Sequence, residues 1–261
     1  MTADEIAAAR GRKILFLYPH SVLNDELLIE ILSNEYEIYC LRDHEAARSV
    51  ARAWQGSIFF VNIDDAMKEA QWEAWIRDLT SQPLTASTRL GIVTYNPNPE
   101  LAKKYLMDLG IPCGFIQLKL GLAEGKRIIL KTLEANEARG RRRFVRARCA
   151  DPARSTFNVT LNGSLVTGSI VDISIAGMAF IFNHPVPGLK SSSPMSDVQL
   201  RLKGTLCRIS GKYVGEVKGE QGSELMMFDA SLPHETTMKI HRFIYQALQE
   251  ELAGFLEHHP S

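Results

Sequence analysis

The apolar residues of this chain recur with two different periods, and the change between them falls near residue 140. Before it, short apolar runs alternate with longer segments in which apolar residues return every three or four positions. The runs suited to buried strands are residues 13–18, 35–41, 57–63, 89–94 and 113–118. The segments between them are typical of amphipathic helices, and the last helix is expected over residues 123–138, with Gly140 ending it. Strands that alternate with helices in this way predict a doubly wound, five-stranded parallel sheet.

The second half has the period-two alternation that is typical of half-buried antiparallel strands. Strands are expected over residues 144–149, 156–161, 165–173, 178–183, 198–203, 206–217 and 224–230. Turn signals such as Asn162-Gly163 separate them, and many short strands with such turns predict a closed barrel. Residues 234–257 then form an amphipathic pattern, so we expect a final helix that packs on the barrel or on a partner.

Composition and charge exclude several classes of protein. The 261 residues include 30 Lys and Arg and 30 Asp and Glu, so the formal net charge is zero. Nucleic-acid coat proteins and strongly cationic membrane binders act through a net positive field, which this chain lacks. No secretory signal and no apolar run of about twenty residues is present, so we expect a cytoplasmic protein without a membrane span.

Catalytic, metal and cofactor chemistry has no support in the sequence. The four cysteines are far apart and form no Cys-x-x-Cys pair, so neither a zinc site nor a disulfide scaffold is expected; they are Cys40, Cys113, Cys149 and Cys207. No nucleophile-and-base constellation and no glycine-rich nucleotide motif emerges. We therefore expect no catalytic residues, no metal ligands and no cofactor.

Two short segments carry the binding chemistry. Arg141, Arg142 and Arg146 belong to a run with four arginines in six residues, and Asp172-x-Ser174-x-x-Gly177 follows about thirty residues later. Arginine offers a planar fork of donors that suits phosphate oxygens and the Hoogsteen edge of guanine. An aspartate accepts from guanine N–H groups, a serine can donate or accept, and a glycine allows a positive-φ turn or a close approach of the backbone to a ligand.

The two segments together resemble the signature of the PilZ domain family, which is Arg-x-x-x-Arg followed by Asp/Asn-x-Ser-x-x-Gly on a small β-barrel. Here the matching residues are Arg142 and Arg146 in the first motif and Asp172, Ser174 and Gly177 in the second. The resemblance implies a six-stranded antiparallel barrel with a C-terminal helix that binds the bacterial second messenger cyclic di-GMP. Arg141, just before the first motif, is similar to the family's additional arginine and implies a further stacking or phosphate contact, with one ligand molecule or a stacked pair.

The first half resembles a response-regulator receiver domain in the order and length of its elements. It lacks the acidic pair after the first strand, where Tyr18-Pro19-His20 stand, and Asn62 replaces the acceptor aspartate. Asp64 and Asp65 lie two and three residues beyond that position. Thr94 and Lys119 match the switch Thr/Ser and the invariant Lys of receiver domains. Because little remains to hold Mg²⁺ or accept a phosphoryl group, we interpret this half as a pseudo-receiver used for protein interaction or packing.

These patterns give a receiver-like domain over residues 1–122, a helix and arginine-rich linker over 123–146, and a PilZ barrel with its helix over 147–261. The function we expect is a non-enzymatic cyclic di-GMP receptor, in which the ligand rearranges the two domains and alters the interaction with an unidentified partner protein. Two alternatives stay open. One is nucleic-acid binding through the arginine run, and the other is an adaptor without a ligand that acts through its pseudo-receiver and last helix.

Overall fold

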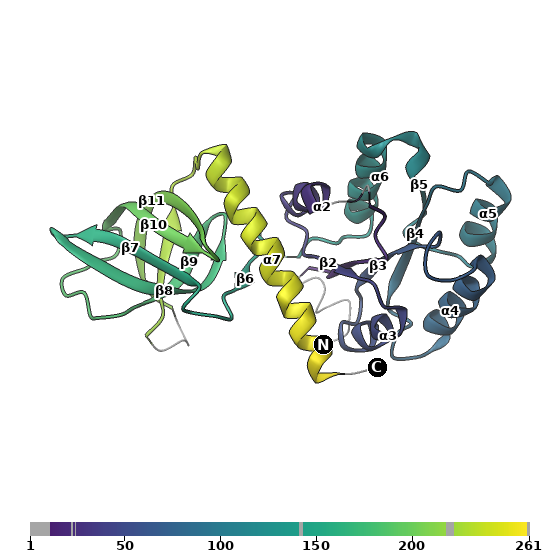
Figure 1. Cartoon of the computed structure of the whole chain (residues 1–261), viewed down its shortest axis with the longest axis horizontal. Helices are drawn as coiled ribbons and strands as arrows, with labels where there is room; N and C mark the ends of the chain where they lie inside the picture. Colours follow the sequence, from purple (N-terminus) through teal and green to yellow (C-terminus); the bar gives the residue numbers. More distant parts are fainter. Residues whose placement is uncertain (1–10, 22, 24, 141–142, 218–221, 260–261) are drawn as a thin grey trace. The chain divides into compact units, whose positions relative to one another are not determined.

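The computed structural model describes residues 11–21, 23, 25–140, 143–217 and 222–259. The chain folds into two compact units, one formed by residues 1–143 together with 249–261 and the other by residues 144–248. Each unit has its own sheet, and each is treated separately below (Figure 1).

The first unit contains the predicted parallel sheet. Its strands are β1 (Ile14–Leu17), β2 (Ile38–Leu41), β3 (Ile58–Asn62), β4 (Arg89–Thr94) and β5 (Phe115–Gln117). They are joined in the order β2-β1-β3-β4-β5, and each neighbouring pair is parallel. This is the strand order of the flavodoxin-like doubly wound fold, to which receiver domains belong, so the five-stranded prediction is confirmed.

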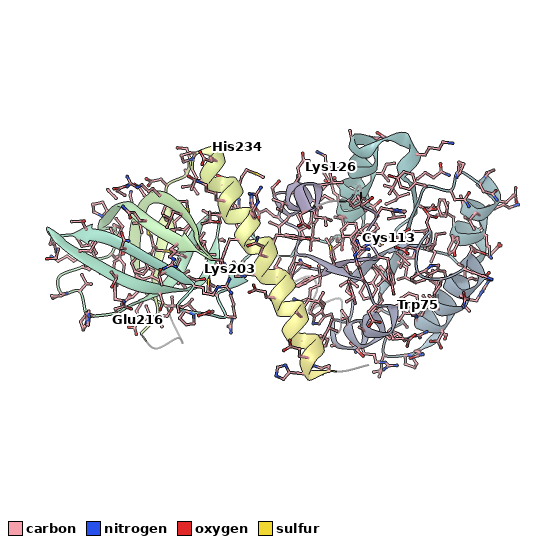
Figure 2. All side chains as sticks on the ribbon, in the orientation of Figure 1. Trp75, Cys113, Lys126, Lys203, Glu216 and His234 are labelled. Atoms are coloured by element: carbon pink, nitrogen blue, oxygen red, sulfur yellow. The ribbon has the colours of Figure 1, made fainter. Side chains whose placement is uncertain are left out.

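Helices cover both faces of this sheet, which explains why its central strands are apolar throughout. They are α2 (Asp25–Leu32), α3 (His44–Ala53), α4 (Glu69–Ser81), α5 (Pro99–Lys103) with its π-helical extension η1 (Lys104–Asp108), a 3₁₀ turn η2 (Leu118–Leu120) and α6 (Leu122–Ala135). Every residue of β1 and β3 is buried. On α4, Trp72 and Trp75 are buried as well, so these two rings are core residues. Trp75 is labelled in Figure 2.

Helix α6 ends earlier than the sequence predicted. The prediction placed the end at residue 138 with Gly140 as the breaker, whereas the helix stops at Ala135. Glu137 takes a left-handed conformation with φ 50° and donates its N–H to Glu134 O, while Ala138 donates to Leu133 O. This is a Schellman motif with glutamate in the position that glycine usually takes, which is why the sequence did not reveal it.

The second unit contains the predicted barrel. Its strands are β6 (Ala147–Arg148), β7 (Ser155–Leu161), β8 (Ser164–Ser174), β9 (Gly177–Phe182), β10 (Pro194–Leu202), β11 (Thr205–Glu216) and β12 (Glu224–Phe228). The sheet order is β6-β8-β7-β10-β11-β12-β9, and a further pairing of β8 with β9 closes six of these strands into a barrel. The six-stranded antiparallel barrel is confirmed, and β6 adds a short seventh strand on the outer edge of β8.

The final helix, α7 (His234–His258), contributes residues to both units. It begins at His234, which is labelled in Figure 2. Its first part buries Ile240, Phe243 and Ile244 in the barrel unit. There Lys203 Nζ lies 5.4 Å from the centre of the Phe243 ring. From Gln249 onward the helix belongs to the first unit. Among the helices of the described residues, none is long and apolar enough to cross a membrane.

We expect one histidine on α7 to make the stability of the barrel unit depend on pH. His241 is 4% exposed, and neither ring nitrogen has a hydrogen-bond partner among the described residues. Burial lowers its pKa. Because the unfolded chain binds the proton more readily than the folded one, the free energy of unfolding should fall as the pH drops below about 6.5, by at most ~1.4 kcal/mol per pH unit for one proton.

Urea unfolding followed by circular dichroism between pH 7.5 and 5.5 tests this expectation. His241→Gln should flatten part of the slope, whereas His258→Gln, on the exposed end of the same helix, should leave it unchanged. Equal slopes for wild type and His241→Gln would contradict it.

Candidate functional site

Strand β6 brings the end of the arginine run beside the second motif. Ala147 pairs with Ile173 and Arg148 with Asp172, in an antiparallel ladder. The residue before β6, Arg146, therefore lies next to the end of β8, and its Nη1 is 3.9 Å from Asp172 Oδ1. The Arg146 side chain is 50% exposed and that of Asp172 23% exposed, so both remain open to a ligand. Two of the predicted site residues are thus held together on one edge of the barrel.

A β-bulge aims Asp172 outward. The β8–β9 register shifts between Ile170 and Asp172, which leaves Val171 as the extra residue. Strict alternation would place Ile170 and Asp172 on the same face, but Ile170 and Ile173 are the residues that are buried. Because of the bulge, Ile173 faces the core again although it lies three residues after Ile170, and the Asp172 carboxylate points away from the core.

The other two motif residues form the turn from β8 into β9. Ser174 is 3% exposed, and its hydroxyl accepts from Ala176 N–H at 3.2 Å and lies 3.3 Å from Gly177 O. This is the turn chemistry that serine supplies at a tight bend. Ser174 pairs with Gly177 in the β8–β9 ladder, so the motif is a complete hairpin end.

Gly177 is explained by the close approach of another strand. A Cβ atom at this position would lie 2.3 Å from Met226 O of β12, a distance that no real side chain tolerates. The residue is part of β9 and has no positive φ, so the turn role expected from the sequence is wrong. The close approach to a ligand stays a prediction, and the structure adds close packing against β12, which the sequence did not reveal. This packing lets β9 and β12 join and close the barrel.

The arginine run is only partly described. Arg141 and Arg142, both assigned to the site from the sequence, lie outside the described residues. Arg143 is exposed, and Arg139 lies in the first unit with its guanidinium carbon 5.0 Å from the centre of the Tyr36 ring. The assignment of the full set of six ligand-binding residues remains a prediction.

Arg148 is a candidate that the sequence did not single out. Its backbone pairs directly with Asp172, and its side chain is exposed. Directly paired residues project from the same face of a sheet, so Arg148 shares the face of the carboxylate. The spacing Arg146-x-Arg148 could have predicted this residue from the sequence, because alternate residues of a strand lie on one side.

In the first unit, the carboxyl ends of β1, β3 and β4 meet around Asp64. Its carboxylate accepts from the Thr94 hydroxyl and from Tyr95 N–H, and His20 Nε2 is 3.2 Å from Oδ2. Burial lowers the pKa of His20, although the neighbouring Asp64 acts in the opposite direction. Asp64 therefore forms a hydrogen bond with Thr94, the residue that matches the switch Thr/Ser of receiver domains.

The other positions compared with a receiver domain are Asn62 and Lys119. Asn62 donates to Tyr18 O at 2.8 Å, and Lys119 is exposed in η2. Within the described part of the chain, no group of three or more His, Cys, Asp or Glu side chains could hold a metal ion. The interpretation of this unit as a pseudo-receiver stays a prediction.

Comparison with known proteins finds similarity in the second half of the chain. The family model of the PilZ domain matches residues 140–246. No curated protein sequence matches the chain. Among solved structures, the PilZ domain with c-di-GMP of YcgR from Escherichia coli has a TM-score of 0.37 at 14% identity, covering 46% of this chain and 98% of that one. MrkH of K. pneumonia in its c-di-GMP complex has a TM-score of 0.32 at 18% identity, covering 46% of this chain and 55% of that one.

The family match and the barrel agree on the same region. The matched residues include the whole arginine run, all strands of the barrel and the first part of α7. Both motifs of the family stand within it, at Arg142 and Arg146 and at Asp172, Ser174 and Gly177. Residues 140–246 of this chain therefore form a PilZ domain.

Proposed function

We propose that this protein is a receptor for cyclic di-GMP. The observation that carries the proposal is the pairing of Arg146 with Asp172 on the β6–β8 edge of a PilZ domain. A guanidinium and a carboxylate side by side offer donors for phosphate or for guanine O6 and N7, and acceptors for guanine N–H groups. A cyclic dinucleotide of guanine is a ligand that uses both.

The residues of the site have separate roles. Arg142 and Arg146 bind phosphate oxygens and guanine edges, and Asp172 accepts from guanine. Arg141 adds a stacking or phosphate contact, which permits one ligand molecule or a stacked pair. The buried hydroxyl of Ser174 holds the hairpin end, and Gly177 closes the barrel beneath it. Cyclic di-GMP is a ligand here, not a substrate, and no cofactor takes part.

Binding is converted into a signal through the position of the arginine run between the two units. The boundary between the first and the second unit falls within the run, between residues 143 and 144. Hydrogen bonds to charged groups are each worth roughly 1.5–3 kcal/mol. Several that form together approach the ~5.5 kcal/mol that moves a two-state equilibrium almost completely. Ligand binding thereby rearranges the two domains and alters the interaction with a partner protein.

Replacing Arg146 tests the proposal directly. Arg146→Ala should weaken cyclic di-GMP binding by at least about a hundredfold, since it removes a bidentate charged donor and the ion pair that positions Asp172. Isothermal titration calorimetry at micromolar protein is the measurement. Asp172→Asn should also weaken binding, but by less, because the amide keeps one acceptor oxygen.

A matched control is available on the same barrel. Arg208 is exposed and forms a 3.6 Å ion pair with an exposed aspartate, so Arg208→Ala should bind like wild type. Unchanged affinity of Arg146→Ala would refute the site. Titration with single-stranded DNA in place of cyclic di-GMP distinguishes the receptor from a nucleic-acid binder, whose affinity would fall steeply with salt and would not need Asp172.

A further inference from the structure

The stretch just before the arginine run is fixed in the first unit by a buried arginine. Arg12 is 5% exposed. Its Nε donates to Asn136 O at 3.2 Å and its Nη1 to Gly56 O at 2.7 Å, while its backbone N–H donates to Ala138 O at 2.8 Å. One residue thus holds the C-terminal end of α6, the loop before β3 and the chain that leaves the helix.

A second arginine binds the same point. Arg89 of β4 donates from Nη1 to Asn136 O at 3.3 Å and to Asn136 Oδ1 at 3.2 Å. Two guanidinium groups therefore converge on the carbonyl that ends α6, where the helix dipole is negative and cations are favoured. Arginines are seldom fully buried unless they are paired, and here the backbone that ends α6 supplies hydrogen-bond acceptors for both arginines. These hydrogen bonds hold residues 136–138 in place.

The fixed stretch extends to the start of the run. A Cβ atom on Gly11 would lie 3.0 Å from the backbone nitrogen of Gly140, so the two chain segments are in contact. Arg139 lies over the Tyr36 ring. On the other side of the run, Ala147 is already paired in β6. Residues 141–146 lie between these two stretches in the sequence, and they include all three arginines of the proposed site.

We propose that Arg12 is a positioning residue for the capture of cyclic di-GMP, and that the Arg12–Asn136–Arg89 cluster couples the ligand to the parallel-sheet unit. The inference rests on the proposed function. Arg12 does not touch the ligand; it fixes the chain from which the ligand-binding arginines extend, so that fewer backbone conformations are lost on binding. Coupling of this kind is reciprocal, so bound ligand also stabilises the end of α6 and the start of β1.

Arg12→Lys is the variant that tests it. Lysine keeps the charge but cannot donate to Asn136 O and Gly56 O from one planar fork. We expect cyclic di-GMP to bind about tenfold more weakly in calorimetry, which corresponds to ~1.4 kcal/mol. Hydrogen exchange with and without cyclic di-GMP should show ligand-induced protection of the amides at residues 136–140 in the wild type, and loss of that protection in Arg12→Lys.

Two further variants complete the design. Arg89→Lys leaves Arg12 in place and should weaken binding by a smaller factor of about three, which keeps the proposal testable if Arg12→Lys folds poorly. Arg48→Lys is the control, since Arg48 in the same unit bonds to Asp78 far along the chain from Asn136, and it should bind like wild type.

The possible failures are distinguishable. If the wild type binds cyclic di-GMP and Arg12→Lys and Arg89→Lys bind equally well, the cluster only supports the fold, and the positioning role is wrong while the receptor function stands. The same conclusion follows if bound ligand leaves the exchange of residues 136–140 unchanged. If the wild type does not bind cyclic di-GMP at all, the proposed function itself is wrong.

Discussion

Gly177→Ala is expected to destabilise the barrel by about 3 kcal/mol or more and to abolish ligand binding as a consequence. The added Cβ would lie 2.3 Å from Met226 O, which is backbone and cannot rotate away. Gly177 pairs with Met227 and the next residue, Met178, with Met226, so relief of the clash requires β9 and β12 to separate. Urea unfolding followed by circular dichroism, together with calorimetric titration of cyclic di-GMP, measures both effects.

The matched control is a glycine of the final helix. A Cβ atom on Gly254 of α7 would meet no other atom within 4 Å, and the residue has no positive φ, so Gly254→Ala should stabilise the protein slightly, by up to ~1 kcal/mol. If Gly177→Ala unfolded at the same urea concentration as the wild type yet failed to bind, the glycine would act through ligand contact, and the packing explanation would be wrong.

The sequence predicted the two sheets well because each has a strong and different period. Buried parallel strands are short apolar runs, as in residues 58–62, and barrel strands alternate, as in residues 155–161. The pairing of Arg146 with Asp172 was also foreseeable from the two motifs. The register that produces it was not, since it depends on the two-residue strand β6 and on a bulge at Val171.

Features that depend on individual polar residues were not predicted from the sequence. The end of α6 depends on a left-handed Glu137, and glutamate carries no signal for that conformation. The two arginines that bind Asn136 are 124 and 47 residues away from it, too far for any local pattern. For α7, amphipathic periodicity predicted a helix, but it could not show that the last turns belong to the first unit.

Removal of residues 249–261 is expected to destabilise the parallel-sheet unit by about 3–5 kcal/mol. Strand β2 is at the edge of its sheet, and Gln249 completes that edge: its Oε1 accepts from Cys40 N–H at 2.9 Å and its Nε2 donates to Ile38 O at 3.0 Å. One side chain thereby replaces the contacts of a neighbouring strand. Without it, the edge of the sheet loses these bonds, and exposed strand edges promote aggregation.

Other contacts of the same segment add to the effect. Glu251 Oε1 lies 3.0 Å from Lys13 Nζ, and the Phe255 ring packs against Trp54 with centroids 5.5 Å apart. All three tryptophans of the chain, at positions 54, 72 and 75, belong to the first unit. Tryptophan fluorescence during urea unfolding therefore reports this unit alone, and its transition should shift to lower urea in the truncated protein.

A point variant separates the edge contact from the general loss of helix. Gln249→Ala removes both bonds to β2 and should cost about 1–3 kcal/mol, because a partly buried N–H and a partly buried carbonyl lose the amide that satisfies them. Glu257→Ala, an exposed position on the same helix, should have no effect beyond a few tenths of a kcal/mol. A tryptophan transition that stays in place in both Gln249→Ala and the truncated protein would mean that the C-terminal segment contributes nothing to the first unit.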